Sequence, residues 1–378
     1  MIKFLRRLLY VLIGILVAFS LFAVISGKTY LFKAIAYNFA DIDDYKKFSN
    51  NTVPDGVAQP WEQSAFYNQP VMPDTLAGFL KDISTIGVVV IKSDSILFEK
   101  YWEGYNDSSY SSSFSVAKSI TSLLIGIAIK EGLIHSVNDP VSNYLPEFKD
   151  GEKAKLKIAD LLTMSSGSDW DESYANPLSV TTELYYGSNA NKVASEVKII
   201  HQPGSLHSYK SGDTQLLGMI VEKVTGKSLS SYASERLWKP IGAEHAALWS
   251  TDKDGGNEKA YCCFNTNARD FARFGQLMLD SGRWKGQEII SPEYYFQSIK
   301  PCMIPDETGS PCNYYGYQWW IYPGQENIFY ARGILGQYVI VIPSKKLVLV
   351  RLGKKRSDQR INKAPAEVAK LINWAMTL

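Results

Sequence analysis

The 378-residue chain has little of the chemistry that many enzymes use, because it contains four cysteines and four histidines. Neither residue type shows metal-ligand spacing, and no G-x-S-x-G segment, which places the serine of an α/β-hydrolase, is present. We therefore expect no metal site. A Ser-His-Asp triad is disfavoured, although His207, close to Tyr209 in the chain, keeps that alternative open.

An excess of charge of one sign is also missing. The chain has 40 basic and 38 acidic residues, which gives a net charge of +2. Such a balance predicts no nucleic-acid partner. Internal repeats and low-complexity segments are absent, and the 46% hydrophobic content is enough for a large core.

One long hydrophobic run stands out near the N-terminus. Residues 8–26 form 19 consecutive uncharged residues, preceded by Lys3, Arg6 and Arg7. This length can cross a bilayer, and the positive flank places the N-terminus in the cytoplasm. We expect residues 1–27 to be an uncleaved anchor, with a cleaved signal peptide ending before Gly27 as the alternative. In both cases the rest of the chain is periplasmic or extracellular.

The cysteines fit this compartment without requiring disulfides. Cys302 and Cys312 flank a loop and could pair, or all four thiols could be reduced. Cys262 and Cys263 are adjacent, and we expect no bridge between them because bonds between neighbours are strained and rare.

Beyond the anchor, residues 28–75 show little periodicity and are interpreted as a spacer that wraps onto the body. Two β-branched runs, residues 86–91 and 96–102, are joined across Ser93-Asp94 and predict a hairpin. Further predicted strands cover residues 317–322, 328–330, 337–342 and 347–352.

The middle of the chain has mainly helical patterns. Helices are predicted after Ser115 and after Ser291, and over residues 158–164, 214–224, 229–237, 268–279 and 364–376. Strands at both ends with helices between them predict an α+β fold, in which an antiparallel sheet is flanked by terminal helices. The hydrolase domain would span 76–378, with a sheet lobe (76–134 and 316–378) and an inserted helical lobe (135–315).

The most informative motif is Ser115-Val116-Ala117-Lys118, at the start of an apolar helical stretch. A serine and a lysine three residues apart share one helix face, so the pair supplies a nucleophile and a base. The helix start also offers free N–H groups and the positive dipole end. Burial in this apolar helix should lower the pKa of Lys118 toward that of a usable base.

Two further motifs follow in order. Tyr209-Lys210-Ser211 comes after a Pro-Gly turn, in a loop before a helix. Residues 331–337, which begin Ala-Arg-Gly-Ile, lie between two β-patterned runs, and we place them at the start of an edge strand.

With S-x-x-K, Y-x-S and x-x-G in this order, the chain resembles the serine β-lactamase and D,D-peptidase superfamily. It is most similar to the class C-related branch that contains 6-aminohexanoate-dimer hydrolases and related esterases. Supporting segments are residues 161–167 with Trp170 and residues 268–275. The resemblance spans about residue 80 to the C-terminus.

The resemblance implies roles for individual residues. Ser115 would attack the carbonyl, Lys118 or Tyr209 would accept its proton, and Tyr209 would protonate the leaving group. The N–H groups of Ser115 and Ile334 would form an oxyanion hole, with Gly333 allowing close backbone approach. A plain strand glycine is the alternative interpretation of Gly333. No cofactor is needed.

The same resemblance implies a set of substrate contacts. They are Tyr174, which matches a substrate-contacting tyrosine in spacing, together with Ser211, Gly333, Ile334 and Trp320. Because side chains alternate along a strand, at most one of Trp319 and Trp320 faces the cleft.

The third motif departs from the family pattern, because Ala331 stands where a lysine or histidine is usual. Arg332 should then point to the opposite sheet face if Ala331 and Gly333 face the cleft. We therefore expect poor β-lactamase activity and better esterase or amidase activity.

The sequence thus predicts a membrane-anchored serine hydrolase that acts on a small ester or amide through an acyl-enzyme. Two alternatives stay open. One is a D,D-peptidase or β-lactamase, and the other is a non-catalytic penicillin-binding-like module.

Overall fold

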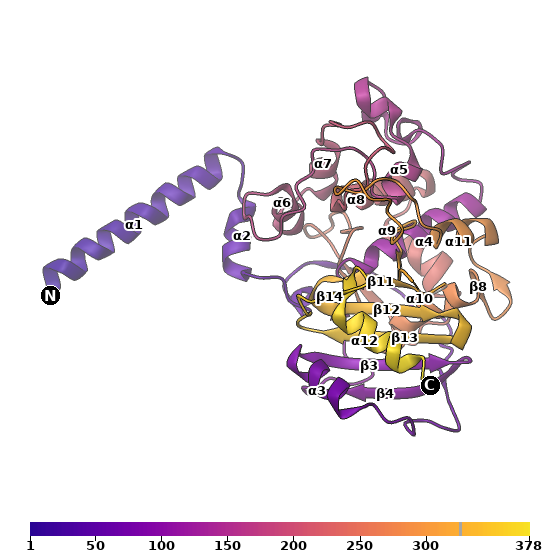
Figure 1. Ribbon diagram of the computed structural model, residues 1–378. Coiled ribbons are helices and arrows are strands. Elements are labelled where there is room, and N and C mark those ends of the chain that lie inside the picture. The colour runs from indigo at the N-terminus through magenta and orange to yellow at the C-terminus, as the bar shows by residue number, and fades with distance from the viewer. Residues whose placement is uncertain (325–326) are drawn as a thin grey trace.

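A seven-stranded sheet forms the centre of the protein (Figure 1). The computed structural model describes residues 1–324 and 327–378. Neighbouring strands are antiparallel except β2 and β4, which are parallel. In spatial order the strands are β10 (Trp320–Ile321), β11 (Phe329–Gly333), β12 (Gln337–Ile342), β13 (Leu347–Gly353), β3 (Thr85–Lys92), β4 (Ser95–Tyr101) and β2 (Glu62–Gln63).

The hairpin predicted from the two β-branched runs is confirmed. Strands β3 and β4 are joined at Ser93 and Asp94, whose φ angles are 48° and 63°. Two consecutive residues with positive φ match the twist of a tight hairpin. Nearly every residue of β3 and β13 is buried, since both faces of the sheet are covered.

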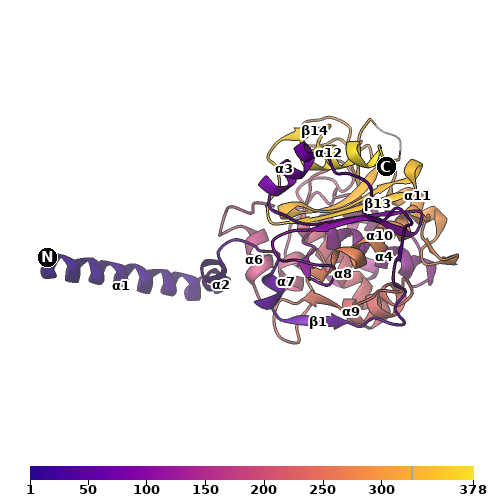
Figure 2. The ribbon, with the colours of Figure 1, turned by 90° about the horizontal axis from the view of Figure 1, so that it is seen from below.

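Helices cover the two faces of this sheet. Figure 2 shows α3 (Asp74–Asp82) and α12 (Ala366–Ala375) on one face, and α4 (Val116–Lys130) and α10 (Ala268–Leu279) on the other. Each face therefore has its own apolar core. The bounds of α10 are those expected from its apolar periodicity.

The remaining helices and strands lie mainly between β4 and β10 in the chain. The helices are α5 (Ile158–Leu162), α6 (Val180–Tyr186), α7 (Ala190–Ser195), α8 (Ser211–Thr225), α9 (Leu229–Ala233) and α11 (Pro292–Ser298). A second sheet has the order β1 (Asn50–Val53), β6 (Ala247–Ser250), β7 (Phe264–Thr266), β5 (Ser111–Ser112). Two small hairpins are β8 (Arg283–Trp284) with β9 (Gln287–Glu288) and β14 (Arg360–Ile361) with β15 (Ala364–Pro365).

The segment between the first helix and α3 is more ordered than its sequence suggested. It contains α2 (Tyr30–Tyr37), and its strands β1 and β2 each join one of the two larger sheets. Strand β1 pairs with β6 from Asn50 opposite Ser250 to Val53 opposite Ala247. A four-residue strand has too little periodicity to be recognised without its partner.

Three predicted elements differ from the structure. The strand expected over 317–322 is only Trp320–Ile321, because Gln318 has a φ of 63° and its N–H donates to the Leu162 carbonyl. The helix expected over 229–237 ends at Ala233 and continues as a π-helical turn. The Ala331–Gly333 motif ends β11, which lies between β10 and β12, so the expected edge-strand start is wrong.

The first helix, α1 (Ile2–Ile25), projects away from the body (Figure 1). Within the described residues it is the one helix whose length and composition would allow it to cross a membrane. Helix α2 follows it and lies between α1 and α6, as both views show (Figures 1 and 2). Tyr30 and Leu31 of α2 are buried against Tyr186 of α6.

Candidate active site

Ser115 lies where strand β5 turns into helix α4. It occupies the N-cap position, and its hydroxyl caps no backbone N–H of the helix, so the oxygen is free for other contacts. Phe114, the residue before it, has a φ of 42°, a left-handed conformation that is uncommon for a phenylalanine. The tight turn presents the Ser115 hydroxyl at the positive end of the helix dipole.

Lys118 lies one turn further along α4 and points back at this serine. Its Nζ donates to Ser115 Oγ at 3.1 Å and to the Tyr261 carbonyl at 2.9 Å. The side chain is buried, and burial lowers the pKa of Lys118 to about 8, although the charges of Glu172 and Asp213 oppose this shift. A substantial neutral fraction is thus present near physiological pH, as expected from the apolar helix.

Tyr209 reaches the same point from the loop before α8. Its ring lies 5.2 Å from Lys118 Nζ and stacks on Trp320, with 5.6 Å between the ring centroids. Burial and the negative charge of Glu172 raise the pKa of Tyr209, and a side-chain hydrogen bond with Ser115 opposes that rise. A phenol with a raised pKa stays protonated, so its chemistry is that of a proton donor.

The end of strand β11 packs closely against the serine turn. A Cβ on Gly333 would lie 2.3 Å from the Ser113 carbonyl oxygen, so a side chain here would force the backbone apart. The N–H groups of Ser115 and Ile334 donate to no other described residue. Two free N–H groups beside a nucleophile can receive the oxygen of a carbonyl under attack.

Glu172 is a site residue that the sequence analysis missed. Its carboxylate accepts hydrogen bonds from the Ser211 N–H (2.7 Å) and hydroxyl (2.6 Å), from Trp170 Nε1 (2.8 Å) and from the Tyr174 hydroxyl. It ties the start of α8 to the loop that carries Tyr174. No motif points to this residue, because the contact that joins it to the active-site loop, with Ser211, spans 39 positions of the chain.

Tyr174 and Trp320 both border the space in front of Ser115, as do Gly333 and Ile334. Tyr174 is 54% exposed and lies at the rim, whereas Trp319, the residue before β10, is fully buried in the core. The expectation that only one of the two tryptophans faces the cleft is confirmed, and it is Trp320. Ser211 begins α8, and its hydroxyl is held by Glu172.

A polar cavity of about 500 Å³ lies in front of Ser115. The expected orientation of Ala331 and Arg332 toward this cavity is wrong. Ala331 does not face the cleft, because it is buried in the core beneath the sheet. Arg332 lines the cavity, with its guanidinium 4.3 Å from the Trp320 ring. The same cavity is also lined by three further cations, Arg356, Arg360 and Lys363, and by two carboxylates, Asp306 and Glu307. Ala331 and Arg332 do point to opposite faces of β11, as alternation requires. Because β11 ends at the rim of the cleft, the face that carries Arg332 borders the cavity.

The cysteine expectations are also corrected. Cys262 and Cys263 form a disulfide, whereas Cys302 and Cys312 are free. The bonded pair directly follows Tyr261, whose carbonyl accepts from Lys118, and Cys263 has a left-handed φ of 69°. The sharp backbone turn at this point brings the two neighbouring thiols together.

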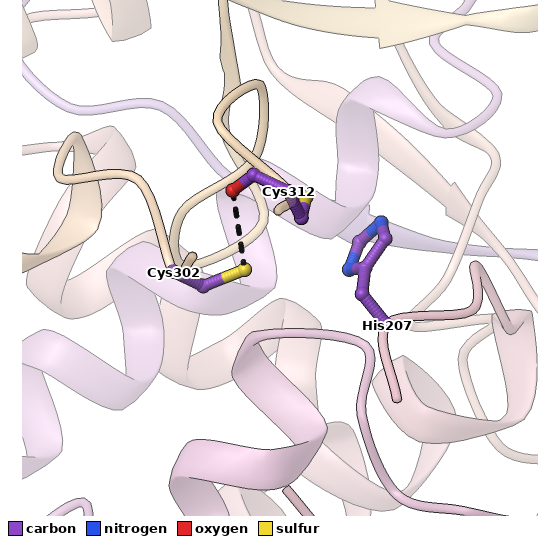
Figure 3. Close-up of side chains that lie close together, drawn as sticks. All are labelled: His207, Cys302 and Cys312. Carbon is purple, nitrogen blue, oxygen red and sulfur yellow. Dashed lines mark hydrogen bonds between the residues drawn. The ribbon is translucent and has the colours of Figure 1, made fainter. Parts of the chain in front are cut away.

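Three donor side chains gather beside the Tyr209 loop (Figure 3). His207 Nδ1 lies 2.9 Å from the Thr163 carbonyl oxygen, which leaves Nε2 for other partners, and its ring faces Cys302 and Cys312. The ligand atoms of these three residues lie within 4.8 Å of one another. One imidazole and two thiols are a donor set that soft metal ions accept. Their wide separation in sequence hid this cluster.

His207 is not arranged as a triad base. Its ring contacts a backbone carbonyl rather than a carboxylate, and Lys118 instead is the base nearest the Ser115 hydroxyl among the described residues. A histidine does contact a carboxylate elsewhere, where His245 pairs with Asp270 and joins the segment after the π-helical turn to α10.

Comparison with known proteins identifies the family of the chain. The sequence model of the family described as Beta-lactamase matches residues 73–372. The 6-aminohexanoate-dimer hydrolase of Paenarthrobacter ureafaciens is 27% identical over 301 residues, which cover 74% of this chain and 75% of that protein. A protein named "Putative D-alanyl-D-alanine carboxypeptidase" from Salmonella agona (strain SL483) is 30% identical over 189 residues, 43% of each chain.

Solved structures show the same fold. The structure named "Putative 6-aminohexanoate-dimer hydrolase from Bacillus anthracis" has a TM-score of 0.75 and 26% identity, and the match covers 89% of this chain and 91% of that one. A family VIII carboxylesterase has a TM-score of 0.63 at 18% identity, covering 80% and 95% of the two chains. The second likeness concerns the fold alone.

Proposed function

The chain belongs to the beta-lactamase family of serine hydrolases, and we propose that it cleaves an ester or amide bond through an acyl-enzyme on Ser115. The observation that carries this proposal is the 3.1 Å contact between Lys118 Nζ and Ser115 Oγ at the start of a helix. A neutral lysine at this distance can accept the serine proton as the oxygen attacks.

The other site residues complete the cycle. The Ser115 and Ile334 N–H groups stabilise the tetrahedral oxyanion, and Tyr209 gives its proton to the leaving oxygen or nitrogen. A water molecule, deprotonated by the same groups, then attacks the acyl carbon and releases the acid. Because the pKa of Tyr209 is raised, Lys118 is the base and Tyr209 the acid in this scheme.

Replacement of the nucleophile tests this proposal. Ser115→Ala should abolish ester hydrolysis and labelling by a fluorophosphonate while the protein stays folded, since a small hydroxyl is all that is lost. Ser119→Ala, in the same helix but hydrogen-bonded to the Gln318 carbonyl, is the matched control and should keep both. Labelling of the Ser115→Ala protein at wild-type rate would refute the assignment.

The N-terminal helix is proposed to be a membrane anchor with the catalytic body outside the cytoplasm. Its charged residues Lys3, Arg6 and Arg7 precede the apolar run, which favours this orientation. A phosphatase reporter, which works only outside the cytoplasm, should be active when fused after residue 30. Activity at the same position of a reporter that works only in the cytoplasm would reverse the topology.

A second candidate function, action on D,D-peptides or β-lactams, is favoured by one observation. Arg332 lines the cleft and offers a cation for a substrate carboxylate, which removes the reason to expect poor β-lactamase activity. A charge-assisted contact of this kind contributes ~1.5–3 kcal/mol. If this function operates, cephalosporin turnover should exceed that of a short ester, and Arg332→Gln should lower it by one to two powers of ten.

A further inference from the structure

A second cavity begins at the same serine and runs in a different direction. It has a volume of about 750 Å³ and shares Ser115, Tyr174 and Ile334 with the polar cavity. Its walls are mainly apolar, and they include Phe114 and Leu335 near the serine and Leu31, Phe22 and Phe19 at the far end. This volume falls within the ~300–1,000 Å³ that is usual for small-molecule sites.

The far end of this cavity is formed by the proposed anchor. Phe19 and Phe22 belong to the last two turns of α1, and Leu31, Ala34 and Ile35 belong to α2. At 1.5 Å per residue, the uncharged part of α1, residues 8–25, is ~27 Å long, close to the ~30 Å hydrocarbon core of a bilayer. Phe22 and Phe19 lie about 5 and 9 Å below the end of the helix. If α1 spans the bilayer, both side chains lie in the outer part of the hydrocarbon core, just below the headgroups.

The surface around α2 fits the same depth. Phe32, Ile35 and Phe39 are 41%, 65% and 80% exposed, and Leu178, on the loop before α6, is 50% exposed. Large apolar side chains gathered beside a membrane-spanning helix are typical of a surface that enters the membrane interface. The mouth of the cavity would thus open toward the lipid rather than toward water.

The two cavities meet at Ser115, and their linings differ in polarity. The apolar one leads toward the proposed membrane surface. The polar one carries four cations, which outnumber its two carboxylates, Asp306 and Glu307; the cations are Arg332, Arg356, Arg360 and Lys363. A molecule that fits both has a long hydrocarbon chain on one side of a carbonyl and an anionic polar group on the other. An acyl ester of a phosphate-bearing membrane lipid has this form.

We propose that the substrate is a long-chain acyl ester of a membrane lipid, with the acyl chain in the apolar cavity and the anionic headgroup in the polar one. The proposal rests on the proposed acyl-enzyme function. The Ser115 oxygen bonds to the acyl carbon, the bond to the headgroup oxygen breaks, and that oxygen takes a proton. Water then cleaves the acyl-enzyme, so the balanced result is ester plus water giving fatty acid and alcohol.

Chain-length selectivity of the full-length protein in phosphatidylglycerol vesicles tests this. The measurement is kcat/KM for 4-nitrophenyl laurate and butyrate, together with fatty acid released from the vesicles. Wild type should prefer laurate by at least tenfold and release fatty acid. Ala34→Trp fills the cavity and should lower the laurate-to-butyrate ratio at least tenfold, whereas Ala36→Trp, exposed on the same helix and outside the cavity, should not.

A second pair of variants guards against misfolding of Ala34→Trp. Leu178→Gln removes a half-exposed apolar side chain from the cavity and should lower the ratio, whereas Leu133→Gln, exposed elsewhere, should not. The proposal is overturned if wild type prefers butyrate, if no lipid is cleaved, or if cavity and control variants behave alike. Hydrolysis of butyrate by Ser115→Ala would instead overturn the acyl-enzyme function itself.

Discussion

Lys118 is central to the proposed mechanism. The burial that lowers its pKa and makes it a usable base also makes its charged form costly in the folded protein. Its ammonium is held by one serine oxygen and one backbone carbonyl, with no carboxylate in direct contact among the described residues. The pKa of about 8 lies below that of the unfolded chain. The unfolded state therefore binds more protons between these two values, and the contribution of Lys118 to stability rises with pH across that range.

Replacement of Lys118 should separate activity from stability. Lys118→Met should lower kcat/KM by ~10²–10⁴, because the base is lost, while the free energy of unfolding at pH 7 stays the same or rises. Wild-type kcat/KM for an ester should increase with pH around a midpoint near 8 as the lysine becomes neutral. A flat profile from pH 6 to 9, or a strongly destabilised Lys118→Met, would contradict this role.

Tyr209 should behave as the partner on the same proton path. Tyr209→Phe should reduce turnover by about a hundredfold or more, with the larger effect on amides, whose leaving nitrogen needs the proton most. Combined with Lys118→Met, the loss should be smaller than the product of the single losses. Double-mutant kinetics on an ester and an amide with the same acyl group measure this. Multiplicative losses would mean that the two residues act independently.

At the scale of elements, the site depends on the close approach of β11 to the turn before α4. Gly333→Ala should lower both activity and stability, because the added Cβ meets the Ser113 carbonyl oxygen at 2.3 Å and Ile334 must move away. Gly78→Ala, in α3 with open space around it, is the matched control and should be neutral or stabilising by up to ~1 kcal/mol. Thermal unfolding and ester kinetics on both variants test this. An active, stable Gly333→Ala would show that the approach is not needed.

Elements and residues whose signals are local in the chain could be predicted from the sequence. The bounds of α10 and the β3–β4 hairpin follow from periodicity and turn residues that are local in the chain. Ser115 and Lys118 were recognisable because a helix brings residues three apart together. Glu172 was hidden, because its role depends on contacts with Ser211 across 39 positions. The prediction that Arg332 points away from the cleft was wrong. Alternation predicts on which face of the strand a side chain lies, but not which face borders the cleft at the end of the strand.

At the scale of the whole molecule, we expect the proposed anchor, α1, to be separable from the catalytic body. Helix α1 projects away from the body (Figure 1), and Ala23 is its only buried residue among those described. Deletion of residues 1–27 should give a soluble protein that still hydrolyses short esters, because Ser115, Lys118 and Tyr209 keep their contacts. Sedimentation and butyrate kinetics check this. A truncated protein that aggregates or loses butyrate hydrolysis would show that the anchor is part of the catalytic body.

The measurement that tests the central claim most directly is mass spectrometry of the acyl-enzyme. The full-length protein is mixed with 4-nitrophenyl butyrate, quenched in acid during turnover, and digested for peptide mapping. The account predicts a butyryl group on the Ser115 oxygen, more abundant in Tyr209→Phe if deacylation is slowed, and absent from Ser115→Ala. A butyryl group on another residue, or turnover without any covalent adduct, would contradict it.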